Sequence, residues 1–235
     1  MGEIRAENNK YRHELKYLIS DMQMQILQTR IKGLMFEDPH TGKEGSYQIR
    51  SLYFDDYYNS CFYDNEDGND YRKKYRIRIY NHSDQIIHLE CKEKVHGKTK
   101  KRMCELSKAQ AESLLAGEML PAFSEQPRVL QELNEAVQTR LMRPKVIVEY
   151  ERFPFVYSCG NVRVTFDTNL RSSAGLGDFF EENLRGRAVF PTGMQLLEVK
   201  FDEYLPDTIY RMLQLENLQQ TTFSKFYYCR KIYIR

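Results

Sequence analysis

The segment YRIRIY, at residues 75–80, places two arginines two residues apart among isoleucines and tyrosines. Because alternate residues of a β-strand point to the same face, Arg76 and Arg78 share one face with Tyr80, opposite the isoleucines. The apolar face is expected on a core. A strand whose other face lies in water tolerates two neighbouring guanidinium groups, whereas a strand that lines an anion site needs them.

Charged and apolar faces alternate in the same way in at least four other segments. The charged faces carry Glu14 with Lys16; Glu90 with Lys92 and Lys94; Arg163 with Asp167; and Glu198 with Lys200. Each segment alone is typical of a solvated strand. Their repetition favours one shared location, which a closed barrel supplies when its apolar faces pack outward against helices and its charged faces line the interior.

The alternation predicts strands over 11–19, 47–56, 71–80, 86–94, 100–106, 144–155, 162–171, 194–203 and 227–235. Helical spacing of apolar residues predicts helices over 20–35, 107–117, 125–142 and 206–218. Ser20 and Ser107 are the expected N-caps, and Gly117 the expected stop. Without an internal repeat or linker, we expect one domain over 1–235. Its fold class is α+β: a closed antiparallel β-barrel tunnel of about eight strands with flanking α-helices.

The composition limits the partners of such a barrel. With 41% hydrophobic residues the chain can bury a core, and with a net charge of only +2 any anion site must be local. No apolar run approaches the roughly 20 residues of a membrane span, so direct membrane insertion is not expected. The N-terminus has no hydrophobic signal-peptide core, and the five cysteines form no CxxC, which together indicate reduced thiols and a cytoplasmic location.

Several catalytic motifs fail on their spacing. HGKTKK, at 96–101, has Lys92 where a phosphate-binding P-loop needs a glycine. DNEDGND, at 64–70, has its glycine at the fifth position rather than the sixth of a calcium loop, so an acidic turn is expected. With no HExxH and no GxSxG, a zinc site or a serine triad has no support.

Cations crowded inside a barrel repel one another, and a polyanion threading the barrel would neutralise them. Arginine suits this role because its planar fork binds two phosphate oxygens at once. A glutamate beside a phosphate repels it unless a divalent metal lies between them, and Mg²⁺ and Mn²⁺ favour that mixed oxygen environment. The pattern therefore favours a phosphate-chain site with a metal.

Eight fragments taken in order carry a family resemblance: ELKY, SLYFDD, YRIRIY, LECKEK, VEYERFPF, VRVTFDTNL, LLEVKF and FSKF. From about residue 9 to 231 the chain resembles the polyphosphate polymerase domain of the vacuolar transporter chaperone (VTC) family, a branch of the triphosphate tunnel metalloenzymes, also called CYTH-like. The resemblance implies an ATP-dependent polyphosphate polymerase, a phosphotransferase that adds the γ-phosphate of ATP to a growing chain. It also implies a manganese cofactor, Mn²⁺ (or Mg²⁺).

Matching the motifs residue by residue implies the site. The catalytic residues would be Arg76, Arg78, Glu198 and Lys200, with Glu198 as the metal ligand. The substrate-binding residues would be Lys16, Lys92, Lys101, Arg152, Arg163 and Lys225. Arg102 replaces Lys101 as the inward residue if a bulge shifts the register. Periodicity leaves open whether Glu149 and Glu151 face inward.

The chain departs from the eukaryotic members of the family, since no SPX regulatory domain and no transmembrane segment are found. A free-standing, prokaryote-type member is therefore expected, with ATP and polyphosphate or triphosphate as partners and a membrane protein as a further possible one. Two other functions suit the same tunnel: hydrolysis of inorganic triphosphate or nucleoside triphosphates, with Glu14, Glu90, Glu149 or Glu151 as base, and non-catalytic polyphosphate binding. Nucleic acid is not expected, because the aromatic residues lie mainly on the apolar faces.

Overall fold

The computed structural model describes residues 10–121, 125–215 and 218–234. Its strands are β1 (His13–Ser20), β2 (Phe36–Glu37), β3 (Tyr47–Asp55), β4 (Arg72–Tyr80), β5 (Ser83–Val95), β6 (Lys98–Leu106), β7 (Arg143–Tyr157), β8 (Val162–Ser173), β9 (Arg187–Ala188) and β10 (Met194–Phe201). Its α-helices are α1 (Asp21–Lys32), α2 (Ser60–Glu66), α3 (Lys108–Leu115), α4 (Arg128–Arg140), α5 (Asp207–Met212) and α6 (Lys225–Lys231). Two 3₁₀ helices, η1 (Cys159–Asn161) and η2 (Leu176–Phe180), complete the elements of these ranges.

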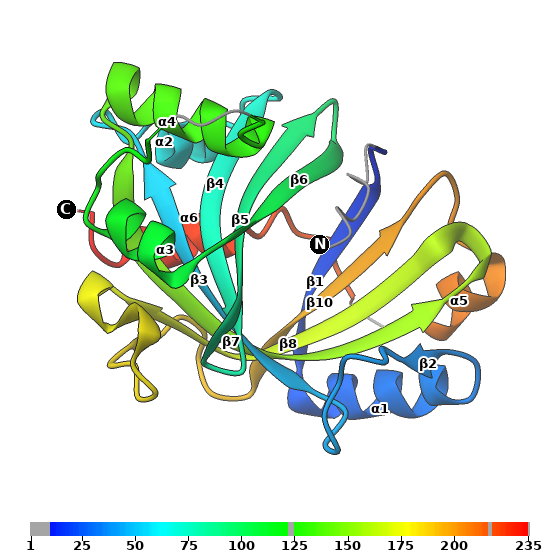
Figure 1. Ribbon diagram of the computed structural model, residues 1–235. Coiled ribbons are helices and arrows are strands. Elements are labelled where there is room, and N and C mark those ends of the chain that lie inside the picture. Colours follow the sequence, from blue (N-terminus) through cyan, green and yellow to red (C-terminus); the bar gives the residue numbers. More distant parts are fainter. Residues whose placement is uncertain (1–9, 122–124, 216–217, 235) are drawn as a thin grey trace.

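The strands form one antiparallel sheet with the main order β1-β10-β8-β7-β3-β4-β5-β6, curled into a half-barrel (Figure 1). The predicted closed barrel is wrong. Across the described residues, the edge strands β1 and β6 join through one isolated pair, in which Arg12 and Thr99 exchange two backbone hydrogen bonds of 2.9 Å. Further along β1, the Thr221 N–H donates to the Lys16 carbonyl at 2.8 Å, so this edge is already occupied and cannot pair with β6.

Helices cover both faces of the half-barrel. On the outer face, α3 and α4 pack against apolar residues of β3 to β6, and α1 and α5 pack against those of β1, β8 and β10. On the inner face, α2 and α6 bury a third cluster that includes Tyr53, Tyr150, Phe223 and Phe226. The inner face is therefore apolar where it packs against α6, and its remaining part carries charged residues.

Most local predictions are confirmed. Ser20 and Ser107 each accept the N–H of the third residue of the helix that follows, in complete capping boxes, and Gly117 has φ +78° just after α3. The predicted strand over 227–235 is wrong for its described residues. That segment is mainly α6, which Ser224 caps and which buries Phe226 and Cys229 inside the half-barrel.

Helix α2 was not predicted. The Asp55 carboxylate accepts the backbone N–H groups of Cys61 and Phe62 at 2.9 and 3.1 Å, which fixes the start of this helix close to the end of β3.

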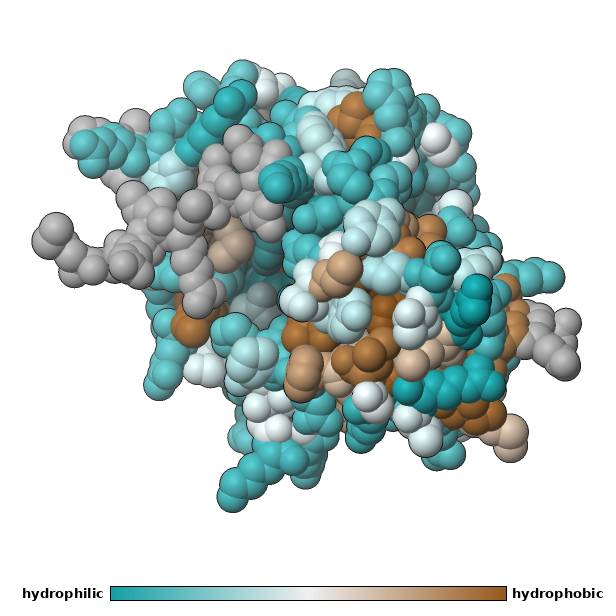
Figure 2. Space-filling model, turned by 90° about the vertical axis from the view of Figure 1, so that its right-hand side faces the viewer, coloured by the Kyte–Doolittle hydropathy of each residue, from teal (hydrophilic) through white to brown (hydrophobic). Residues whose placement is uncertain are grey.

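No helix in the described ranges has the length and apolar character that crossing a membrane requires. Apolar residues do gather on the side of the molecule that carries α1 and α5, among polar ones (Figure 2), and Met22 and Ile26 of α1 are exposed.

Candidate functional site

The ladder register places the predicted charged faces together on the inner face. Residues directly opposite in antiparallel strands point the same way, so the pairs Tyr53–Arg76 and Arg76–Glu90 set one side of the half-barrel. The pair Lys16–Glu198 sets the other side. The repeated alternation of the sequence thus becomes one surface built by strands far apart in the chain.

Eight cationic and four acidic side chains form ion pairs on this surface. We call them the inner charge cluster: Lys16, Arg76, Arg78, Lys92, Lys101, Arg152, Lys200 and Lys225, with Glu14, Glu90, Asp167 and Glu198. All the sequence-predicted site residues except Arg163 lie in it. With every group ionised, the cations outnumber the carboxylates two to one.

Glu198 lies at the centre of one half of the cluster. Its carboxylate accepts from Lys225 Nζ at 2.7 Å, and Arg152 Nη2 lies 3.4 Å away. Lys200 Nζ and Lys16 Nζ lie 3.5 and 3.7 Å away. Burial alone would raise the pKa of Glu198, but these cations, Lys225 foremost, hold that pKa well below its usual range. Glu198 is thus an ionised carboxylate that is buried among cations.

Glu14 shares two of these lysines. Its Oε2 accepts from Lys92 Nζ at 2.7 Å, whereas its buried Oε1 accepts no hydrogen bond from the described residues, although Lys200 Nζ lies 3.3 Å away. Burial would raise the pKa of Glu14, but Lys16, Lys92 and Lys200 hold that pKa well below its usual range. Glu14 therefore combines a negative charge with an oxygen free to accept a further partner.

Glu90 organises the other half of the cluster. Arg76 donates to it from Nε at 2.7 Å, Lys101 donates at 3.0 Å, and Arg78 Nη1 lies 3.8 Å away. The choice between Lys101 and Arg102 is settled by the register. Lys101 faces inward, while Arg102 faces outward and donates twice to Glu132 of α4, both at 2.7 Å.

Tyr150 connects the two halves. Its hydroxyl accepts from Arg78 Nη2 at 3.4 Å, and its ring lies 4.8 Å from Lys225 Nζ and 5.2 Å from the Arg152 guanidinium carbon. The partners that hold Arg78 by hydrogen bonds are the hydroxyls of Ser51 and Tyr150, both neutral. The Arg78 charge is thus less committed to a carboxylate than the Arg76 charge.

Arg163 stands apart from the cluster. It pairs with Asp38 at 2.8 Å, donates to the Tyr47 hydroxyl at 2.9 Å, and its side chain is one-third exposed. Glu149 lies on the outer face, paired with the fully buried Arg50 at 2.6 Å, and Glu151 shares that face and accepts from Ser46 at 2.7 Å. Neither glutamate faces the cluster, so neither can act as a base there.

The sequence reasoning missed two participants. Asp167 was recognised as inward-facing but not as the partner of Arg152, and the sequence holds no local signal for that pairing. Lys74 has the same parity as Arg76 and Arg78 on β4, so the alternation could have identified it.

The fold family implies a divalent metal. In the ranges that the structure describes, no three His, Cys, Asp or Glu side chains come close enough together to hold one. Glu14 and Glu198 nonetheless fit a site completed by phosphate oxygens, because both are ionised, both contact Lys16 and Lys200, and Glu14 Oε1 has no hydrogen bond. The predicted single ligand Glu198 thus gains a neighbouring carboxylate.

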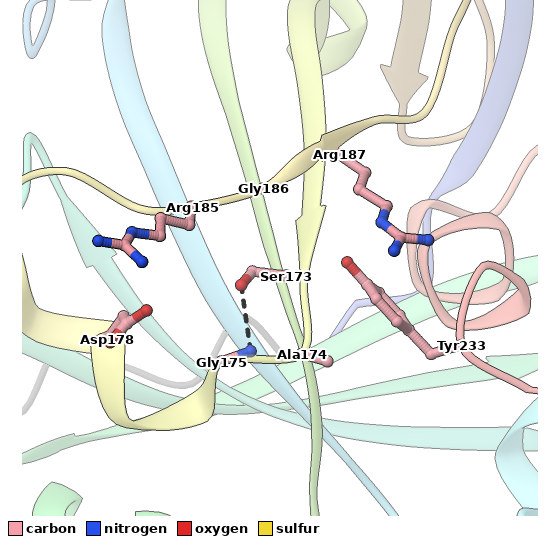
Figure 3. Close-up of a pocket in the computed structure, with 8 residues that line it drawn as sticks. All are labelled: Ser173, Ala174, Gly175, Asp178, Arg185, Gly186, Arg187 and Tyr233. Atoms are coloured by element: carbon pink, nitrogen blue, oxygen red, sulfur yellow. Dashed lines mark hydrogen bonds between the residues drawn. The ribbon is translucent and has the colours of Figure 1, made fainter.

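A surface cavity of about 440 Å³ lies elsewhere, between the end of β8 and the loop before β9 (Figure 3). Arg185, Arg187 and Tyr233 lie at its walls, and the Ser173 hydroxyl accepts the Gly175 N–H at 3.1 Å. Both arginines are exposed, and none of the predicted site residues lines this cavity. The side chains that the sequence analysis assigned to phosphate binding therefore lie away from this cavity.

Comparison with known proteins gives a family and a fold. The family model described as the VTC domain matches residues 11–234. Among curated proteins, none matches the sequence.

Two solved structures share the triphosphate tunnel (CYTH-like) fold. A putative adenylyl cyclase from Hippeastrum, described as having a dominant triphosphatase activity, is similar with a TM-score of 0.55, 15% identity, and coverage of 96% of this chain and 97% of that one. A putative adenylate cyclase from Bacillus halodurans is similar with a TM-score of 0.50, 15% identity, and 87% coverage of each chain.

Proposed function

The chain belongs to the VTC domain family, and from this premise we propose that it is an ATP-dependent polyphosphate polymerase. The reaction breaks the bond between the γ-phosphorus of ATP and its bridging oxygen, whose electron pair leaves with ADP. A new bond forms between that phosphorus and a terminal oxygen of the acceptor chain. Phosphoryl transfer of this kind depends on positioning and charge neutralisation more than on a covalent nucleophile.

The observation that supports this proposal is the excess of cations on the inner face. Eight cationic side chains surround four carboxylates on the concave face of the half-barrel, and the four carboxylates are almost wholly buried. A polyanion would neutralise the excess positive charge, and a guanidinium group can bind two phosphate oxygens at once. ATP and a phosphate chain supply the matching negative charges.

The proposed roles follow from how each side chain is held. Arg78, which hydroxyl groups rather than a carboxylate hold by hydrogen bonds, would bind the transferring phosphoryl group together with Arg76 and Lys101. Lys16, Lys92, Lys200 and Lys225 would neutralise the adjoining phosphates. Arg152, paired with Asp167, would position Glu198, and Arg163 would contact the chain at the rim of the half-barrel.

Glu198 and Glu14 would hold the divalent metal, Mn²⁺ or Mg²⁺. When bound, the ion would neutralise phosphate charge and stabilise the leaving group. The two carboxylates themselves orient Lys16 and Lys200, which contact both of them.

Hydrolysis of triphosphate is the second candidate. The buried Oε1 of Glu14 favours it, because this oxygen accepts no hydrogen bond from the described residues and could accept one from an attacking water molecule. The activity described for the Hippeastrum neighbour agrees with this candidate, although at 15% identity that likeness concerns the fold alone. We place either reaction in the cytoplasm, since all five cysteines are free thiols.

One experiment separates the candidates. The purified protein is incubated with ATP and Mn²⁺, and the products are resolved on a gel that separates phosphate chains by length. A ladder of chains with release of ADP supports the polymerase. Release of phosphate from tripolyphosphate without a ladder supports the hydrolase. If neither occurs and polyphosphate still binds, the protein is a receptor and both catalytic proposals are wrong.

A further inference from the structure

Lys74 lies on the inner face of β4, in a row of cations that continues from Arg78 and Arg76 toward Arg72. Its Nζ donates to Asn65 Oδ1 of α2 at 2.9 Å and to Ser224 Oγ, the cap of α6, at 3.1 Å. The Phe226 ring lies 5.1 Å from the same nitrogen. Two different helices thus hold this ammonium group in place.

The surroundings of Lys74 do not neutralise its charge. Its direct cross-strand partner is Lys92 on β5, and Lys16 of β1 and Arg72 of β4 add to the repulsion. Its hydrogen-bond acceptors are a neutral amide and a neutral hydroxyl, and within the described ranges it forms no ion pair with a carboxylate. Arg76 and Lys92 differ in this respect, because Glu90 and Glu14 neutralise them.

An uncompensated lysine in this place is costly to the fold. Like charges that lie directly opposite in a sheet destabilise it, and burial penalises the charged form. Burial foremost, with the repulsion of the neighbouring cations and against an opposing effect of Cys61, lowers the pKa of Lys74 to about 7. The free protein therefore holds this side chain near its point of half-protonation at neutral pH.

An ammonium group has three N–H donors, of which Asn65 and Ser224 accept two. The remaining donor is available to a ligand beside Lys16 and Lys92. We propose that Lys74 is an additional phosphate-binding residue of the inner face, and that it takes up a proton from solution when a phosphate chain binds. This inference rests on the proposed function only in requiring that the inner face bind a phosphate chain, and it requires no turnover.

The proton uptake has a definite size. At pH 8, a lysine with a pKa of about 7 is roughly one-tenth protonated, and a bound phosphate would keep it fully protonated. Binding should therefore take up roughly 0.9 proton at Lys74 for each chain bound at pH 8, and much less at pH 6.

Isothermal titration calorimetry measures this uptake directly. The full chain, in metal-free buffer so that no turnover occurs, is titrated with tripolyphosphate at pH 8 in HEPES and in Tris. The difference between the two apparent enthalpies gives the number of protons taken up. The variants are Lys74→Met and Lys74→Arg. The matched control is Lys73→Met, because Lys73 directly precedes Lys74 in β4 and its Nζ lies 3.6 Å from Glu132 on the outer face.

We expect Lys74→Met to weaken binding about tenfold, the effect of losing one charge-assisted hydrogen bond, and to reduce the proton uptake by most of one proton. Lys74→Arg should keep the affinity within a few-fold yet show the same loss of uptake, since a guanidinium does not titrate at pH 8. Lys73→Met should change neither quantity. A higher melting temperature for Lys74→Met without ligand would show that this variant folds.

Two results would overturn the inference while leaving the proposed function intact: an unchanged affinity in Lys74→Met, or an undiminished proton uptake in Lys74→Arg. If the unmodified protein fails to bind tripolyphosphate at all, the phosphate-binding role of the whole inner face is wrong, and this inference with it.

Discussion

Arg152 and Asp167 form a doubly hydrogen-bonded ion pair across β7 and β8, with both N–O distances at 2.7 Å and both side chains buried. The resemblance implies that Arg152 binds substrate, yet this geometry commits its fork to a carboxylate of the protein. Lys225 reaches the same carboxylate at 2.6 Å. Arg152 is thus better placed to hold Asp167 and Glu198 than to bind a phosphate.

Replacing Arg152 with Met should therefore affect folding strongly. It leaves Asp167 buried with one cation fewer, and breaking a buried pair in this way costs about 3 to 5 kcal/mol. Urea denaturation measures the loss. The double variant Arg152→Met with Asp167→Leu should regain most of it, because the buried Lys225 then still pairs with Glu198. Additive losses in the double variant would contradict a coupled pair.

Glu198→Gln should lower turnover at least a hundredfold and leave metal-free binding of tripolyphosphate intact or tighter. The substitution removes a negative charge from among four cations and with it the proposed metal ligand. Turnover is followed by ADP release, binding by calorimetry, and Mn²⁺ binding by electron paramagnetic resonance. Glu93→Gln on the outer face of β5 is the control and should behave as the unmodified protein. Loss of tripolyphosphate binding in Glu198→Gln would argue against the metal role.

Substitutions of Arg76 and Arg78 should differ in their effects on folding stability and on tripolyphosphate binding. Arg76 neutralises Glu90, which is fully buried, so Arg76→Met should cost about 3 kcal/mol of folding free energy as well as affinity. Arg78 is held by the hydroxyls of Ser51 and Tyr150, so Arg78→Met should weaken tripolyphosphate binding about tenfold or more at a smaller cost in stability. Thermal denaturation and calorimetry on both variants test this contrast, and equal losses of stability would refute it.

Much of this site follows from strand periodicity. The two-residue period assigns each side chain to a face whether or not the sheet closes into a barrel. For this reason Lys16, Arg76, Lys92 and Lys200 lie together as predicted. The same argument could have identified Lys74, because it lies two residues before Arg76 on the same strand and so shares its face.

The remaining features depend on contacts that no local pattern encodes. Closure of the barrel fails because residues 220–221 occupy the edge of β1. Arg102 faces outward because β5 and β6 pair without a bulge, and there Glu132 of a distant helix accepts from it. The aromatic, strand-like sequence at 227–231 forms part of α6 because burial inside the half-barrel outweighs its intrinsic preference.

Glu132, which lies outside the inner charge cluster, should contribute to the free energy of unfolding in a way that depends on acid pH. The two hydrogen bonds from Arg102 lower the pKa of Glu132 to about 2, below the value of 4.5 usual for a glutamate, despite an opposing effect of burial. Since the folded state binds the proton less readily than the unfolded chain, the stabilisation is complete above about pH 4.5 and is lost as pH falls toward 2. Allowing for solvent screening, it amounts to about 1 to 2 kcal/mol.

Comparing the unmodified protein with Glu132→Gln by urea denaturation should therefore show a stability difference at pH 6 that shrinks by that amount at pH 2.5. The matched control is Glu105→Gln, because that side chain is 83% exposed and lies 3.9 Å from His88. Its small effect should stay the same at both pH values. A difference for Glu132→Gln that does not change between pH 6 and pH 2.5 would mean that the pair with Arg102 contributes nothing through its charge.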